Sequence, residues 1–417
     1  MVLDASKMER VSIILSKNRQ FNTNQMIQYF AIAYAFVLPL SRAGISFFTA
    51  LLFFLWIIDG NVLNKIKQIF KSQVVRVLIL FITFYFLSLL WADNVTDSLH
   101  YIQRHWHILP LFVLMFSIKK EYIPKILSAF IFGMFISEII SYGIFFNLWE
   151  IGNASYENPS PFMHHIEYSI FLAFTALILL SRIFNEIEIK YKLFYIFFFI
   201  TISGNLFLNA GRTGQFAFIL GLFVLAFLKF ENKLKALFIS SILTIMILGI
   251  AFNISETFQS RIILGKKNIV HVIEDKDYCT SWGGRVGAWI ISKDIIVEHP
   301  LVGAGLVDNM KLFHQIIDTK YPEMKCMHKD FHHIHNQFLQ ILTQSGLIGL
   351  AIFLTIFYMI FKIPLKNKEY QDIKYIYLTV LFFSFMAEVV FPHQFSMTLF
   401  ALIIGLLLAQ HRIENEV

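Results

Sequence analysis

The chain alternates long apolar runs with short polar segments. Each run is close to the roughly 20 residues that a transmembrane helix needs. A transmembrane barrel would show alternating segments of about ten residues instead. The pattern therefore predicts an all-α integral membrane protein with about twelve transmembrane helices. We place these spans at residues 26–40, 44–59, 75–92, 105–118, 123–146, 165–182, 193–209, 214–229, 235–253, 337–361, 374–391 and 395–411.

Lys and Arg concentrate in alternate connections, which gives the expected orientation. The N-terminal segment and the connections after the second, fourth, sixth, eighth and tenth spans are short and basic; examples are Lys65, Lys119 and Lys229. Because such connections stay on the cytoplasmic side, both termini are expected in the cytoplasm. The first twenty residues are polar, so no cleavable signal peptide is evident.

One connection, residues 254–336, is too polar to span a membrane and too long for a simple loop. It is expected to form a mostly helical periplasmic domain between two membrane units, residues 1–253 and 337–417. It holds both cysteines of the chain, Cys279 and Cys326. An oxidising compartment would allow them to pair as a disulfide, and two free thiols are the alternative.

The composition agrees with a membrane protein. Hydrophobic residues make up 57% of the 417 residues and charged residues 15%, against about 25% charged in soluble domains. This excludes a soluble enzyme, a disordered chain and a coiled coil. The formal net charge of +7 comes largely from the basic connections, so no nucleic-acid partner is expected.

The turn Gly211-Arg212-Thr213-Gly214 lies on the expected outer side, where Arg is unusual. A tight turn needs glycine but does not need Arg212. The side chain could snorkel to lipid headgroups. The functional interpretation is a clamp for an anion, because a guanidinium stays charged and grips phosphate in a fork.

The large loop contributes a second arginine and a glycine-rich motif. Arg285 and Trp289 stand one helical turn apart, and a surface salt bridge is the simpler role for Arg285. Ten residues after Trp289 comes His299-Pro-Leu-Val-Gly-Ala-Gly305. The simplest interpretation of this motif is a helix end followed by a glycine turn.

Histidines gather directly before the tenth span, at His332, His333, His335 and the neighbouring Asn336. Imidazole exchanges protons near neutral pH, so His335 is a candidate general base at the membrane rim. The alternatives are a solvated cluster, or a metal site that uses His328 as well. Asp275-Lys276-Asp277 formally matches a metal-binding Asp-x-Asp pattern, but three residues in a charged loop are weak evidence.

Ionisable residues in or near the spans are further candidates. Acidic residues there are expected to pair with and orient cations of the outer side. Basic residues and histidines at the outer rim are candidate substrate contacts, although each alone is more often an interfacial anchor. The acids are Glu138, Glu167 and Glu388, and the rim residues are Arg42, Arg104 and His165.

Taken in order, these motifs resemble the bacterial O-antigen ligase and polymerase superfamily. The shared features are Gly-Arg-Thr-Gly, Arg285 with Trp289, His-Pro-Leu-x-Gly-x-Gly, His335-Asn336, and Gly346-Leu-Ile-Gly349. The motifs cover roughly residues 204–350, while the span count and the single large outer loop cover the whole chain. One departure is Gln344, where members often have an acid, so any acidic role at that position is in doubt.

The resemblance implies an inverting membrane glycosyltransferase of the bacterial inner membrane, active on the periplasmic side. The donor would be a glycan on undecaprenyl diphosphate and, for a ligase, the acceptor would be the lipid A–core oligosaccharide. No metal, cofactor or nucleotide sugar is expected. The essential residues carried over by motif are Arg212, Arg285 and His335. Trp289 and Asn336 are expected near the substrates.

Two other functions stay open on the sequence. A polymerase or a protein O-oligosaccharyltransferase of the same superfamily would share the motifs. A transporter of lipid-linked glycans would instead predict broken helices in repeated halves and polar residues at mid-membrane. The chain has few mid-span charges and no evident repeat, which favours a transferase.

Overall fold

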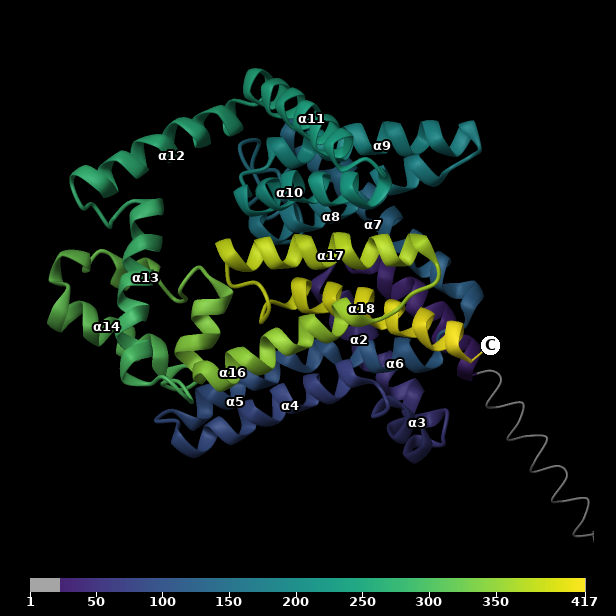
Figure 1. Ribbon diagram of the computed structural model, residues 1–417, viewed down its shortest axis with the longest axis horizontal. Helices are drawn as coiled ribbons and strands as arrows, with labels where there is room; N and C mark the ends of the chain where they lie inside the picture. Colours follow the sequence, from purple (N-terminus) through teal and green to yellow (C-terminus); the bar gives the residue numbers. More distant parts are fainter. Residues whose placement is uncertain (1–22, 417) are drawn as a thin grey trace, which may run out of the picture.

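The computed structural model describes residues 23–416, and the predicted N-terminal basic segment lies outside this part of the chain. Within it, the protein is all-α as predicted, without a β-strand. Figure 1 shows helices α2 to α18 as a bundle with a separate group of helices at one end. A helix over residues 23–37 comes first. The bundle then contains α2 (Arg42–Ile58), α3 (Val62–Ile69), α4 (Gln73–Leu87), α5 (Val95–Gln103), α6 (Leu109–Ser117), α7 (Ile123–Phe145), α8 (His165–Asn185), α9 (Ile189–Leu208), α10 (Arg212–Lys229), α11 (Lys233–Ile254), α16 (Gln337–Lys362), α17 (Lys368–Ala387) and α18 (Gln394–Asn415).

Eight helices in the described part are long and apolar enough to cross a membrane, or nine if the bent pair α2–α3 forms one span. Three of the twelve predicted spans fall on other helices: residues 23–37, α6 and α17. The first two are short, and α17 carries charged residues in its first turns. A multi-pass membrane protein is therefore clear, while the number twelve remains a prediction.

The helices α8 and α18 form the interior of the bundle. α8 packs against α9, α10 and α17, while α18 packs along α6. Both are apolar around most of their circumference, which is why they bury most of their side chains. By contrast, α11 buries few residues and leaves large apolar side chains such as Phe238 and Ile245 exposed. This exposure suits a helix that faces lipid.

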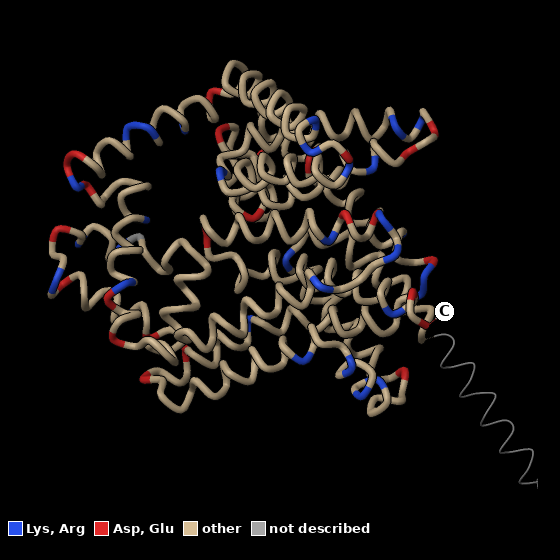
Figure 2. The backbone as a smooth tube through the Cα atoms, in the orientation of Figure 1, with Lys and Arg blue, Asp and Glu red and all other residues tan. Residues whose placement is uncertain are grey.

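The expected outer domain is a group of helices at one end of the bundle, called the loop end below. It contains α12 (Glu256–Glu274), α13 (Ser281–Glu298), α14 (Asp308–Lys320) and α15 (Met327–Asp330). α13 and α14 share a small core of their own around Ile291, Ile295, Phe313 and Ile317. Figure 2 shows many Lys and Arg at the opposite end of the bundle, where the C-terminus lies; we call this the basic end.

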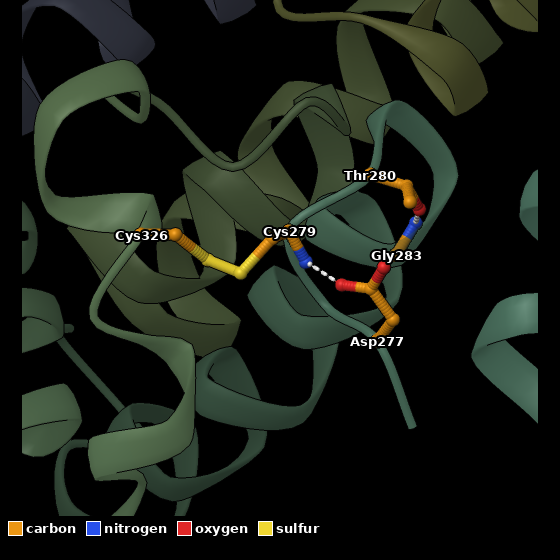
Figure 3. Close-up of a disulfide and its surroundings, with 5 residues drawn as sticks. All are labelled: Asp277, Cys279, Thr280, Gly283 and Cys326. Carbon is orange, nitrogen blue, oxygen red and sulfur yellow. Dashed lines mark hydrogen bonds between the residues drawn. A yellow bond between two sulfur atoms is a disulfide. The ribbon is translucent and has the colours of Figure 1, made fainter. Parts of the chain in front are cut away.

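Cys279 and Cys326 form the disulfide that we expected. The bond joins the start of α13 to the segment before α15 (Figure 3). Beside it, the Thr280 hydroxyl accepts a hydrogen bond from the backbone N–H of Gly283 at 3.0 Å and caps α13. Asp277 accepts one from the N–H of Cys279 at 2.8 Å. The disulfide thus fixes the turn from which α13 starts.

The glycine-rich motif forms a turn, as expected, and it also packs into a break in α16. His299 is the C-cap of α13, and Gly303 and Gly305 follow with positive φ angles. Four backbone hydrogen bonds join residues 300–305 to residues 343–348. α16 is interrupted there by non-helical Gly346, at φ 63° and ψ −165°. A β-carbon at Gly303 or Gly346 would collide with the facing backbone, which explains both glycines.

Candidate active site at the loop end

Arg212 is the first residue of α10 and follows a tight turn from α9. Gly211 and Gly214 allow this turn to lie directly against α8, because a β-carbon at either would collide with Ser169. The Ser169 hydroxyl accepts a hydrogen bond from the N–H of Gly214 at 3.1 Å. The glycines therefore place the helix start, and Arg212 projects from it.

Two buried amides hold the same turn, and no sequence motif indicated their role. Asn209 accepts a hydrogen bond from the N–H of Gly211 at 2.8 Å and donates one to the Ser160 hydroxyl at 2.6 Å. Gln215 donates to the carbonyl oxygens of Leu206 and Asn209, at 3.1 and 3.0 Å. With these groups satisfied, the backbone before Arg212 has little freedom.

The two predicted arginines meet at one serine. Arg212 Nη2 donates to Ser281 Oγ at 3.0 Å. Arg285 Nη1 lies 3.3 Å from the same Oγ and 3.2 Å from the Ser281 carbonyl oxygen. Two guanidinium groups, from segments 73 positions apart in the chain, thus converge on one uncharged group. Their positive charges repel each other, and an anion bound between them would offset this repulsion. The pair is therefore suited to bind an anion.

His335 lies beside Arg285, joined through Glu388. Glu388 follows the last residue of α17, and its Oε2 lies 3.0 Å from His335 Nδ1 and 3.9 Å from Arg285 Nη2. A carboxylate on Nδ1 favours the tautomer that carries the proton there and leaves the Nε2 lone pair free. Glu388 thus lies next to two basic side chains, as expected, and its role in orienting them stays a prediction.

The backbone at His335 is unusual. Its φ of 52° lies in the left-handed region, which a residue with a side chain rarely adopts. The next residue, Asn336, caps α16 by accepting from the N–H groups of Phe338 and Leu339. Strained backbone that is fixed by its surroundings is typical of functional positions. Asn336 also donates to the Met386 carbonyl oxygen at 3.2 Å, so its side chain is engaged within the protein.

The charges of the site are shaped by burial and by this pairing. Burial opposes ionisation of Glu388, but the hydrogen bond from His335 outweighs it and lowers the pKa of Glu388 to about 2. Burial lowers the pKa of His333 to about 4, although Glu388 acts against the shift. Burial also lowers the pKa of Arg285, which Glu388 partly offsets. At neutral pH the site therefore holds an ionised Glu388 and a neutral His333.

Three groups could in principle bind a metal ion. The ligand atoms of His333, His335 and Glu388 all lie within 4.8 Å of one another. This set differs from the one considered on the sequence, because His328 pairs with Asp318 at 3.2 Å and His332 is exposed. Arg285 next to the shared carboxylate competes with a cation there. The geometry fits a hydrogen-bonded His–Glu pair at least as well as a metal site.

Both aspartates of the Asp-x-Asp pattern contact residues close to them in the chain. Asp275 lies 2.8 Å from Nδ1 of His271, and Asp277 caps the N–H of Cys279. Neither contact points to a diphosphate-binding metal.

The other candidate substrate contacts have different surroundings. His165 packs against His164, with ring centroids 4.0 Å apart, and experiences the charges of Arg212 and Glu388. Arg42 packs over the ring of Phe395 at 5.5 Å. Arg104 and Arg42 both act on His393, whose pKa burial lowers and Glu388 raises. Trp289 lies 38% exposed on α13.

The fold and this site define a multi-pass helical membrane protein with a cationic, histidine-containing site at the loop end. Residues 197–354 match the sequence model of a family described as O-antigen ligase. This confirms the resemblance over the segment that contains Arg212, Arg285 and His335, whereas Glu388 lies beyond it. An uncharacterized protein of Haemophilus influenzae (strain ATCC 51907 / DSM 11121 / KW20 / Rd) is 25% identical over 320 residues, 73% of this chain and 77% of the relative. The family match indicates a membrane enzyme of the glycosyltransferase type.

Proposed function

We propose that this protein is an O-antigen ligase. It transfers a glycan from undecaprenyl diphosphate to the lipid A–core oligosaccharide on the periplasmic face of the bacterial inner membrane. The observation that carries this proposal is the meeting of Arg212 and Arg285 at Ser281, with His335 held by Glu388 next to Arg285. Cations for a leaving diphosphate and a base for an acceptor hydroxyl thus lie in one site.

The arginines act on the donor. As the bond between the anomeric carbon and the phosphate oxygen breaks, its electron pair stays with the lipid diphosphate, and negative charge grows on that oxygen. Arg212 and Arg285 stabilise this charge with donors that are already in place. Because a guanidinium presents two parallel N–H groups, it can also fix the orientation of the phosphate.

His335 acts on the acceptor. A sugar hydroxyl attacks the anomeric carbon from the face opposite the diphosphate, which inverts the configuration. Its proton passes to Nε2 of His335, because Glu388 occupies the Nδ1 side. Glu388 then stabilises the imidazolium that forms. In this scheme neither a metal ion nor a cofactor has a role.

A deletion strain tests the function. The expected result is loss of long glycan from lipid A–core, while polymer linked to undecaprenyl diphosphate is still made. Lipid A–core that carries a single repeat would instead identify a polymerase. A normal lipopolysaccharide with a missing glycan on a protein would identify a protein O-oligosaccharyltransferase. Accumulation of lipid-linked glycan on the cytoplasmic face would point to a transporter.

Purified enzyme tests the chemistry. Transfer to lipid A–core is expected to continue in the presence of a chelator. If the chelator abolishes transfer and added zinc, magnesium or manganese restores it, the site binds a metal, and the interpretation as a His–Glu pair is wrong.

A further inference from the structure

A cavity of about 420 Å³ lies between the start of α10 and the helix α12. Figure 1 shows α12 running from the end of α11 across to α13, away from the main bundle. The helix is anchored at its first turn, where Phe258 packs against Phe207 and the Ser255 hydroxyl donates to the Phe207 carbonyl oxygen. Its cavity-lining residues recur at helical spacing: Phe258, Arg261, Ile262, Gly265, Lys266, Ile269 and Val270. One face of α12 is thus a wall of the cavity.

The polar part of this cavity is positively charged. Arg212, Arg261 and Lys266 line it, and none of the described residues around it is acidic. The charge of Arg261 also acts on Arg212 and on His165. The side chain of Arg261 is exposed and has no hydrogen bond or ion pair within residues 23–416. Three cations without a counterion favour an anionic ligand.

The rest of the wall is apolar. Phe258, Ile262, Ile269, Val270 and Trp282 face the same space, and Ile262, Ile269, Val270 and Trp282 are each more than a third exposed. An inorganic anion would leave these side chains uncovered. A ligand with an anionic head and a hydrocarbon chain would satisfy both parts of the wall, and the volume is within the usual range for ligand sites.

We infer that this cavity binds the lipid end of the donor, with the diphosphate between Arg212 and Arg261 and the first isoprene units against the apolar face of α12. The inference rests on the proposed function, because Arg212 belongs to both the cavity and the reaction site. That shared residue is also the reason for choosing the donor over a membrane phospholipid, which would share only the phosphate chemistry. Arg261 thereby becomes a third donor-binding cation that the sequence motifs did not indicate.

Binding of geranylgeranyl diphosphate to the full-length, detergent-purified protein tests this without any transfer reaction. Arg261→Ala is expected to weaken binding about tenfold, which is typical for the loss of one charge-assisted contact. Arg261→Lys should restore part of the affinity. Lys267→Ala is the matched control, because Lys267 is a neighbouring cation that does not line the cavity; it should bind like the wild type.

Gly265→Leu tests the apolar part. A β-carbon at Gly265 would meet only Trp282 Nε1, at 3.8 Å, so the longer side chain fits on the helix and extends into the cavity. Binding of geranylgeranyl diphosphate should fall about tenfold, while the affinity for inorganic diphosphate stays unchanged. Arg261→Ala, by contrast, should weaken both ligands.

Three outcomes would contradict the inference. If Arg261→Ala and Gly265→Leu bind geranylgeranyl diphosphate like the wild type while Arg212→Ala does not, α12 is not part of the donor site. The proposed function would be unaffected by that result. Displacement by phosphatidylglycerol at equal concentration would make the cavity a headgroup site. Unchanged binding in all three variants would remove the donor clamp of the proposed function as well.

Discussion

The two ends of the bundle contain similar charged residues but use them differently. At the basic end, three partly or fully buried cations have acidic partners: Lys229 lies 2.7 Å from Asp372, Lys65 lies 2.9 Å from Asp59, and Arg182 lies 3.0 Å from Glu369. At the loop end, Arg212 and Arg285 share a serine, and the nearby carboxylate of Glu388 is already hydrogen-bonded to His335. Each of the three cations at the basic end has its own carboxylate, whereas at the loop end Arg285 and His335 share Glu388, and Arg212 has no acidic partner among the described residues.

We interpret this difference as one between structural and functional charges. A buried cation without a partner is costly, so a protein keeps one where a ligand supplies the missing charge. Substitutions at the basic end should therefore change stability, whereas substitutions at the loop end should change activity. The predictions below test this contrast, in order of decreasing effect.

The largest effect is expected at the arginine pair. Arg212→Ala and Arg285→Ala should each lower kcat/KM for glycan transfer by about 10³–10⁴-fold, since both donor binding and charge stabilisation are lost. Arg212→Lys should be nearly as damaging, because an ammonium group cannot make the two parallel hydrogen bonds with which a guanidinium binds phosphate. The measurement is transfer of lipid-linked glycan to lipid A–core by purified variants with matched thermal stability. Near-normal transfer by Arg212→Lys would show that a point charge suffices.

His335→Ala should retain donor binding and lose transfer by about 10²-fold or more, because the acceptor proton has no other base. His332→Ala should cost far less, since His332 is exposed and lies outside the His–Glu pair. His333→Ala should also cost less if His335 is the base. Equal loss in His333→Ala and His335→Ala, reversed by added zinc, would assign the three-ligand cluster to a metal instead.

At the basic end, Lys229→Met should destabilise the protein by about 3–5 kcal/mol, because it leaves Asp372 buried without its partner. Transfer per folded molecule should stay unchanged. The double variant Lys229→Met/Asp372→Leu should recover much of the stability, since it removes both charges together. Thermal unfolding in detergent, read beside activity, separates the two effects. A loss of activity at unchanged stability would contradict the contrast between the two ends.

Removing the disulfide should have a smaller effect. The bond joins cysteines 47 positions apart, and the chain-entropy model gives such a link up to about 4 kcal/mol, less where the native state is strained. Cys279→Ser and Cys326→Ser should each loosen the start of α13, which bears Ser281 and Arg285, and should lower activity together with stability. Labelling of both thiols in unreduced, folded wild-type protein would show that the bond does not form.

The helical membrane architecture could be predicted from the sequence, because long apolar runs of span length rarely occur outside transmembrane helices. The sequence singled out Arg212, Arg285 and His335 because each stands in a motif, and the fold places them near one another, while their catalytic roles stay predictions. It did not reveal Asn209 and Gln215 as supports of the turn, or the break at Gly346, since these depend on contacts between segments distant in the chain. Arg261 was missed for the same reason: on the sequence it is one basic residue in a polar loop, and only the fold places it beside Arg212.

The smallest effect concerns pH and is confined to the loop end. His333 has a folded pKa of about 4, below its ordinary 6.5, so the unfolded chain binds more protons in this range and stability should fall as the pH drops from 6.5 to 4. Glu388 has a folded pKa of about 2, below its ordinary 4.5, so its contribution is lost in a second, more acidic window between 4.5 and 2. Melting temperatures measured across both windows should show two steps, and His333→Gln should reduce the first while keeping the second. A first step of the same size in His333→Gln would mean that another group causes it, and His164 and His393, whose pKa values burial also lowers, would be the next to substitute.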